Sequence, residues 1–121
     1  MTGDPIEGQV LLLTAAKASV PASRLPGLVA DVQTDLEGRL EAYRREYECF
    51  LDGDGRQIFL VEWGHWDEVA DRLGLDQRET SAVRRAHEEQ LLRASRRVDR
   101  ETEAETALEI RDPVVIATTD S

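Results

Sequence analysis

Apolar residues recur at helical spacing through the first part of the chain, and this pattern predicts two helices. The first covers residues 5–19, because Asp4, Pro5 and Glu7 offer a capping residue, a proline at the first helical position and a glutamate two residues later. Its residues 10–16 are apolar or small nearly all round. We therefore expect this helix to be central in the fold or buried against a second copy of the chain.

The second predicted helix follows Pro21, which ends the first one. Ser23 can cap it, and one apolar stripe continues at three- and four-residue steps through about residue 46. Gly38 is the weak point of this helix, because glycine lowers helix stability.

β-Favouring residues then replace the helical pattern. Residues 47–51 and 57–63 flank a glycine-rich turn at residues 52–55, which predicts a β-hairpin. The same turn holds Asp52 and Asp54, but Arg56 stands where a calcium loop needs its next ligand. The segment is therefore predicted to be a turn and not a calcium site.

Two further helices are predicted after the hairpin. Asp67 can cap a short helix through residue 73, and Gly74 closes it. Asp76 with Glu79 forms a second capping pair, which opens a long helix to about residue 100. Beyond a polar stretch at residues 101–106, the segments 107–111 and 114–116 on either side of an Asp-Pro break predict a third strand beside the hairpin.

These elements predict an α+β fold of one domain over residues 1–121. A small antiparallel sheet, made of the hairpin 47–63 and the C-terminal strand, is packed by about four helices in the order α-α-β-β-α-α-β. A chain of 121 residues can bury a hydrophobic core of its own without disulfides or metal.

The charge of the chain is strongly negative, with 25 acidic against 15 basic residues and a net charge of −10. Because 40% of the residues are hydrophobic, this acidity belongs to a folded surface and not to a disordered chain. Lys17 is the only lysine, so arginine supplies the other basic side chains. This profile indicates a salt-adapted protein, since molar salt screens the repulsion between like charges. A high-GC actinobacterial source is the alternative.

The location is predicted to be cytoplasmic, with no membrane association. The apolar stretch at residues 10–16 is too short to span a bilayer, and Asp4 and Glu7 stand where a signal peptide carries positive charge. Cys49 is the only cysteine and falls in an apolar, strand-like run, which predicts a buried, reduced thiol.

Candidate chemistry gathers near the hairpin, where all six aromatic residues lie within residues 43–66. Aromatic clusters of this kind usually pack a core. His65, Trp66 and Asp67 are the candidate small-ligand residues, and with Glu68 they could form an acid/base site of a small enzyme. No paired metal-ligand spacing, phosphate loop or serine-presenting turn occurs, so no metal, cofactor or catalytic residue is predicted.

Residues 67–86 resemble a helix-turn-helix. Ala70, Gly74, Leu75 and Val83 fit the positions that let two helices cross closely, whereas Thr80 replaces the usual aliphatic residue. The resemblance implies DNA binding, with four side chains toward the major groove: Gln77, Arg78, Ser81 and Arg85. Residues 78–100 carry seven arginines against four acids, opposite an apolar stripe that includes His87 and Leu91. The alternative is a structural helix whose arginines form ion pairs along its surface, with His87 as a partly buried packing residue.

The whole chain resembles small, uncharacterised proteins of haloarchaea, on its arginine-for-lysine usage and on stretches 82–91 and 107–111. This resemblance implies an origin and no activity. The leading functional hypothesis is a non-catalytic binding or assembly module, a homo-oligomer that buries the first helix or the Leu91 stripe. A DNA-binding regulator is the first alternative, and a small enzyme near His65 is the second.

Overall fold

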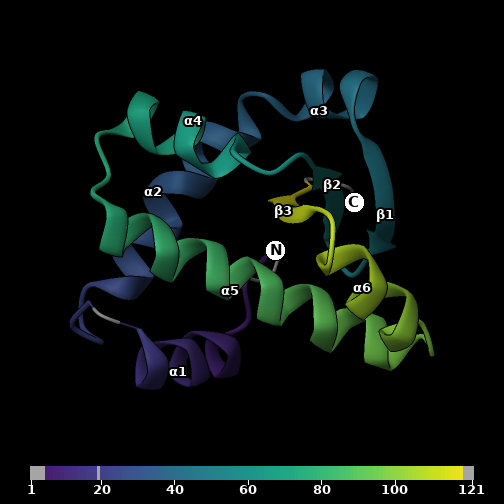
Figure 1. Cartoon of the computed structure of the whole chain (residues 1–121), viewed down its shortest axis with the longest axis horizontal. Coiled ribbons are helices and arrows are strands. Elements are labelled where there is room, and N and C mark those ends of the chain that lie inside the picture. Colours follow the sequence, from purple (N-terminus) through teal and green to yellow (C-terminus); the bar gives the residue numbers. More distant parts are fainter. Residues whose placement is uncertain (1–4, 19, 119–121) are drawn as a thin grey trace.

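The computed structural model of the chain describes residues 5–18 and 20–118 (Figure 1). Within these residues it is an α+β fold with six helices and one three-stranded antiparallel sheet. The helices are α1 (Gly8–Lys17), α2 (Leu25–Glu37), α3 (Leu40–Glu46), α4 (His65–Leu73), α5 (Gln77–Arg97) and α6 (Glu101–Leu108). The strands are β1 (Glu48–Gly53), β2 (Arg56–Val61) and β3 (Asp112–Ala117), arranged in that order across the sheet. The predicted fold class is thus confirmed.

The β1–β2 hairpin forms where the glycine-rich turn predicted it. Asp54 and Gly55 both have positive φ angles, 56° and 78°, which is the conformation that a two-residue turn between twisted strands requires. The register is irregular between Cys49 and Leu51, where β1 has a bulge. Cys49 is exposed there, so the prediction of a buried thiol is wrong. Only Phe50 of β1 is buried, and Leu51 is half-buried against the core. The bulge and the outer position of the strand leave its other residues exposed.

The predicted helix caps at Ser23 and Asp67 are wrong, because Arg24 is the N-cap of α2 and Gly64 is the N-cap of α4. Three predicted boundaries in the helices are also wrong. The first helix begins at Gly8 and not at Pro5, with Glu7 as its N-cap, and Asp4 lies outside the described residues. The second predicted helix is two helices, because the chain turns at Gly38 and Arg39. This turn lets Tyr43 of α3 pack on Phe59, with ring centroids 5.7 Å apart.

The third difference lies between α5 and β3. The polar stretch after residue 100 and the predicted strand residues up to Leu108 form α6. Two features favour a helix over a strand: Glu101 and Glu103 in the first turn complement the helix dipole, and Ala104 buries a small face. β3 therefore starts only at Asp112 and pairs with β2 through Phe59 opposite Val114.

The long helix α5 organises the fold. In Figure 1 it runs, in green, between α1 and β3, and it also contacts α2, α4 and α6. Leu91 and His87 are both fully buried along its inner face. His87 is therefore more buried than predicted, and the Leu91 stripe belongs to the core of the chain. It cannot be the surface on which a second copy docks.

Side chains from three helices form hydrogen bonds with the backbone along the outer edge of β3. Trp66 of α4 donates to the Pro113 carbonyl at 3.1 Å, and His87 of α5 accepts from the Val115 N–H at 2.9 Å. Gln33 of α2 donates to the Val115 carbonyl at 2.5 Å and accepts from the Ala117 N–H at 3.1 Å. A buried strand edge would otherwise leave these backbone groups without partners, at a cost of about 1–3 kcal/mol each.

The aromatic residues fulfil the core prediction except at one position. Phe59, Trp66, Tyr43 and Phe50 are buried, and Tyr47 packs against the core from a half-buried position. Trp63 is 58% exposed, because it follows the last residue of β2 and precedes the turn into α4. Its indole is therefore part of the surface.

Candidate functional site

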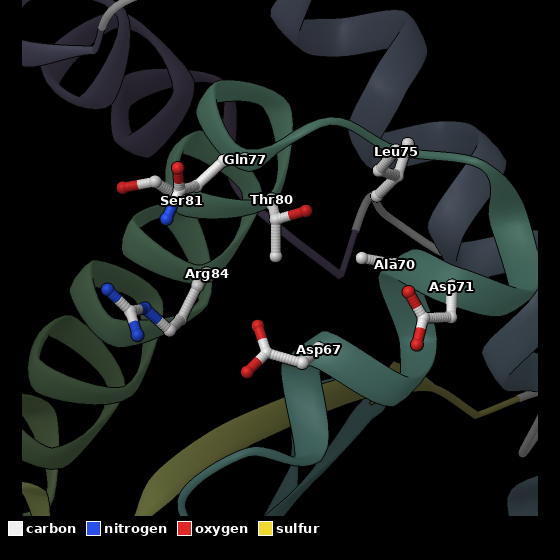
Figure 2. A pocket seen from close by; sticks show the side chains of 8 residues that line it. All are labelled: Asp67, Ala70, Asp71, Leu75, Gln77, Thr80, Ser81 and Arg84. Carbon is white, nitrogen blue, oxygen red and sulfur yellow. The ribbon is translucent and has the colours of Figure 1, made fainter.

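A cleft of about 440 Å³ opens between α4 and α5, on the side of the helix pair that faces solvent (Figure 2). Its lining consists mostly of polar side chains from the two helices and the turn that joins them. The lining residues are Asp67, Ala70, Asp71, Leu75, Gln77, Thr80, Ser81 and Arg84. The volume lies within the range of pockets that hold small molecules.

The local sequence fixes the two walls of the cleft. Gly74 ends α4 in the left-handed conformation, with φ of 72°, and its N–H bonds the Ala70 carbonyl. Asp76 and Glu79 then form the predicted capping box, in which the Asp76 carboxylate accepts from the Glu79 N–H at 2.8 Å. Both helix ends at the turn are thereby satisfied, so the turn holds the helices at one angle.

The charges of the cleft face one another across it. Asp67 and Asp71 lie one turn apart on α4, and Arg84 projects from α5 on the other wall (Figure 2). None of these three side chains makes a hydrogen bond or an ion pair with the residues that the structure describes. By contrast, Arg72 of α4 is bonded to Asp35 at 2.5 Å.

A further carboxyl lies within electrostatic range of these charges. Asp112 at the start of β3 is buried, and one of its oxygens has no partner among the described residues. Burial raises the pKa of this carboxyl; Arg84 lowers it and Asp67 raises it by a smaller amount. Arg84 is also within range of Glu88 but forms no ion pair with it. Acidic groups therefore outnumber basic ones around the cleft.

The predicted ligand residues do not converge. Asp67 lines the cleft, but Trp66 points into the core, where its Nε1 donates to the Pro113 carbonyl. His65 lies beside Tyr43, with 2.5 Å between its Nε2 atom and the Tyr43 hydroxyl. Neither His65 nor Glu68 is among the residues that line the cleft. The described residues thus do not show the acid/base pocket that an enzyme at His65 would need.

The Tyr43–His65 pair has a structural explanation. Burial raises the pKa of the Tyr43 hydroxyl and lowers the pKa of His65, so both groups are neutral near pH 7. The hydroxyl then donates to Nε2, and the imidazole carries its proton on Nδ1. Tyr47 packs edge-on against the same ring, with centroids 5.3 Å apart. His65 therefore links α3 to α4 as part of the packing.

The predicted DNA-contacting residues separate into two pairs. Gln77 and Ser81 line the cleft. Asp67, which was predicted as a small-ligand residue, lines it with them. Arg78 and Arg85 are exposed on α5 outside it and have no ion pair among the described residues. Two aspartates of α4 thus stand beside the surface that would approach DNA, where they repel phosphate.

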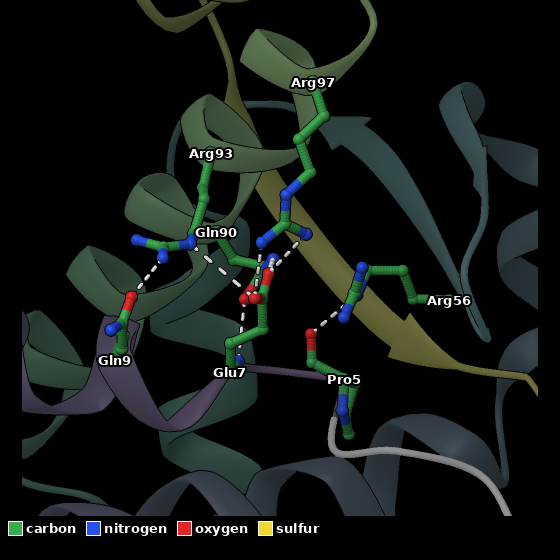
Figure 3. Close-up of polar contacts among 7 residues, drawn as sticks. All are labelled: Pro5, Glu7, Gln9, Arg56, Gln90, Arg93 and Arg97. Atoms are coloured by element: carbon green, nitrogen blue, oxygen red, sulfur yellow. Dashed lines mark hydrogen bonds and ion pairs between the residues drawn. The ribbon is translucent and has the colours of Figure 1, made fainter.

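The remaining arginines of α5 and its C-terminal flank are bonded to carboxylates. Arg97 and Arg93 contact Glu7, at 2.6 and 3.6 Å, and Arg93 also bonds Gln9 (Figure 3). Two further pairs join α5 and its C-terminal flank to α6: Arg96–Glu101 at 2.8 Å and Arg100–Glu103 at 3.0 Å. These ion pairs favour the structural alternative, but their carboxylates lie on the N-terminal segment and on α6, so the predicted pairs along the surface of α5 itself are not formed among the described residues.

Asp71 and Arg84 are functional candidates that the sequence interpretation missed. A signal was present, because Asp67 and Asp71 are four residues apart on one helix, and Gln77, Ser81 and Arg84 follow at steps of four and three on the next. These spacings place each set on one face, but only the angle between the helices turns the faces toward each other. No group of metal-ligating side chains occurs in the described part of the chain, nor does a helix long and apolar enough to cross a bilayer.

The fold and the cleft define a class: a small α+β domain with a charged cleft between two helices that a tight turn joins. The chain matches the family described as "Domain of unknown function (DUF8048)" over residues 4–118, and it belongs to that family. No curated protein and no solved structure matches it. Membership of a small uncharacterised family is thus confirmed, whereas haloarchaeal origin and DNA binding stay predictions.

Proposed function

We propose that this protein is a non-catalytic binding module and that its ligand occupies the α4–α5 cleft. The observation that carries the proposal is the set of unpaired charges on the two walls: Asp67 and Asp71 opposite Arg84. Arg96, Arg97 and Arg100 are bonded to neighbouring carboxylates. Arg78 and Arg85 of α5 have no ion pair among the described residues but lie outside the cleft, so unpaired charges of opposite sign on facing walls are a feature of this cleft. Charged groups arranged in a concave site are typical of small-ligand recognition.

A ligand panel tests this proposal. The ¹⁵N-labelled protein would be titrated in molar KCl with small anions, cations, zwitterions and neutral polyols, and amide chemical shifts would be followed. We expect at least one class to shift amides of the cleft, and we expect Arg84→Gln to reduce that response. Arg85→Gln is the matched control, because Arg85 lies on the same helix outside the cleft. If no class shifts the cleft amides, the proposal is wrong.

Self-association through α1 is a second candidate function, because α1 presents an apolar face to solvent. Leu12 and Leu13 are 74% and 51% exposed, while Val10 and Thr14 are buried on the other side of the helix. α1 also contains no acidic residue, unlike each of the other described helices. In a chain of net charge −10, an acid-free face is where two copies repel each other least. A second copy of the chain is therefore the partner that this face fits.

Sedimentation velocity over a micromolar concentration series tests the assembly proposal. We expect a concentration-dependent dimer that Leu12→Gln with Leu13→Gln abolishes. Val98→Gln is the control, because Val98 is also an exposed apolar residue but lies beyond the end of α5. A wild-type protein that stays monomeric throughout the series contradicts self-association and leaves the cleft proposal untouched.

A further inference from the structure

The charges of the cleft have an arrangement that restricts the chemistry of a ligand. This inference rests on the proposed binding function of the cleft. The α4 wall supplies two carboxylates, Asp67 and Asp71, and the α5 wall supplies one guanidinium, Arg84. The lining therefore carries one net negative charge, and it separates negative from positive across its width (Figure 2).

The α4 wall fits a cation, because a carboxylate accepts hydrogen bonds and donates none. Asp67 and Asp71 are one helical turn apart, so their carboxylates can bind one ammonium together or two cationic groups separately. Asp112, buried and with one oxygen unpartnered, lies within electrostatic range of both Arg84 and Asp67 and adds a further acidic group near the cleft. A purely anionic ligand is therefore disfavoured on this wall.

The α5 wall fits a carboxylate. The Arg84 guanidinium can bind a carboxylate through two parallel hydrogen bonds, and the Ser81 hydroxyl and the Gln77 amide are further donors on the same helix face. A ligand with cations alone would leave Arg84 unpaired in the cleft. A ligand that satisfies both walls thus carries a carboxylate and cationic groups at separate positions.

The apolar part of the cleft is small. Ala70 and Leu75 are its aliphatic side chains, and in Figure 2 they lie toward the turn, on the side of the cleft away from Arg84. A short aliphatic stem matches such a contact, whereas an aromatic or lipid group would not be covered. The volume of about 440 Å³ accommodates a molecule of amino-acid size with water.

We propose that the cleft binds a basic α-amino acid, with its carboxylate on Arg84 and its two cationic groups on Asp67 and Asp71. Such a molecule carries two positive charges and one negative charge, which is the opposite of the lining. Free lysine is the probe of this class. Cadaverine is the diamine that remains when lysine loses its carboxylate, so it isolates the contribution of Arg84.

The experiment compares lysine, cadaverine, leucine and glutamate by amide chemical-shift titration of the full chain in molar KCl. We expect lysine to bind about tenfold more tightly than cadaverine, since one charge-assisted pair accounts for such a ratio. Arg84→Gln should remove this preference without weakening cadaverine, and Arg85→Gln should leave it intact. Asp67→Asn with Asp71→Asn should weaken both ligands at least tenfold. Native amide spectra of each variant verify the fold.

The outcomes separate this inference from the function on which it rests. If cadaverine or glutamate binds the cleft as tightly as lysine, the basic amino acid is the wrong ligand, while the cleft remains a binding site. Unchanged lysine affinity in Arg84→Gln would overturn the assigned orientation and the inference with it. If none of the four probes, and no member of the wider panel, shifts the cleft amides, both proposals fail.

Discussion

The Nδ1 atom of His87 accepts a hydrogen bond of 2.9 Å from the backbone N–H of Val115. Nδ1 can accept only while it carries no proton, so the fold requires a neutral ring with its proton on Nε2. His87 is fully buried, and burial lowers its pKa to about 3. The outer edge of β3 is therefore held by a histidine that must stay neutral.

The free energy of unfolding should fall as the solution is acidified. Below about pH 6.5 the unfolded chain binds a proton at His87, whereas the folded chain does not until about pH 3. Between these limits the single site removes about 1.4 kcal/mol of stability per pH unit. Urea unfolding at several pH values measures this slope.

His87→Asn is the test of this assignment, because an amide oxygen can accept from the Val115 N–H without titrating. We expect this variant to be less stable at neutral pH, since the ring leaves a cavity, but to lose most of the slope between about pH 6.5 and 4.5. His65→Gln is the control and should retain most of it. A wild-type stability that does not change over this range would contradict the role given to His87.

Replacing Gln33 should destabilise the fold more than any exposed substitution on α2. Gln33→Leu keeps the approximate volume but leaves the Val115 carbonyl and the Ala117 N–H without partners. At about 1–3 kcal/mol for each unsatisfied group, we expect a loss of roughly 2–4 kcal/mol in denaturant unfolding. The neighbouring exposed Thr34→Ala should cost under about 0.5 kcal/mol. Equal stability of the two variants would show that Gln33 does not hold the strand edge.

The elements that the sequence predicted correctly are determined by residues that lie close together in the chain. The capping box at Asp76 and Glu79 formed as expected, because both partners lie in one helical turn. The β1–β2 turn formed at Asp54 and Gly55 for the same reason, since the conformation of two residues determines it. Gly38 was identified as a weak point, but only contacts with the sheet determine that the helix breaks there.

The elements that were missed depend on contacts between distant segments. Cys49 has the neighbours of a buried strand residue in sequence, yet the bulge and the edge position of β1 expose it. The cleft shows the same limit, because Asp67 was selected with His65 and Trp66 as sequence neighbours. In a helix, residues three or four positions apart share a face, so the partners of Asp67 are Asp71 and, across the turn, Arg84.

Glu7 should stabilise the contact between the N-terminal segment and α5. Its carboxylate accepts from Arg97 at 2.6 and 2.8 Å and from Gln90 at 2.8 Å (Figure 3). The Arg97 bonds are the main reason that the pKa of Glu7 is lowered to about 2. We expect Glu7→Gln to cost about 1–2 kcal/mol at neutral pH, since charge-assisted bonds are lost while the backbone bond to Gln90 remains.

The pH range over which the free energy of unfolding falls distinguishes the contribution of Glu7 from that of His87. A carboxylate with a lowered pKa stabilises the fold above about pH 4.5, and this contribution is lost as the pH falls toward about 2. Glu7→Gln should therefore flatten the stability curve in this lower range and leave the slope near pH 6 unchanged. Glu105→Gln on the exposed face of α6 is the matched control and should change neither. A Glu7→Gln variant as stable as the control would contradict the role of these bonds.

Removal of salt should unfold the protein. The net charge of −10 generates repulsion over the surface, which molar KCl screens to roughly 3 Å and millimolar KCl does not. We expect the helical circular dichroism signal to fall on dialysis into millimolar KCl. Sucrose at equal osmolality should not restore the signal if charge screening is the cause. A spectrum that is unchanged by dialysis would show that the acidity does not reflect salt adaptation.

The purified protein should retain no specific fragment of host genomic DNA in molar KCl. Arg78 and Arg85 are the exposed arginines of α5 that have no ion pair among the described residues, and α5 is the helix that would enter the major groove. Asp67 and Asp71 lie beside the surface with which these arginines would contact DNA. Two phosphate or base contacts give weak binding, and high salt weakens it further. Sequencing of the retained DNA measures this.

The double variant Arg78→Ala with Arg85→Ala gives this experiment its control. Both residues are exposed, so the variant should fold as the wild type does. Reproducible enrichment of particular fragments by the wild type, lost in the double variant, would establish the helix-turn-helix function. It would also imply that Asp67 and Asp71 act as specificity elements, because carboxylates beside a major-groove helix can accept from cytosine and reject other contacts. Retention that is equal in both proteins would reflect arginines elsewhere and would not support recognition by α5.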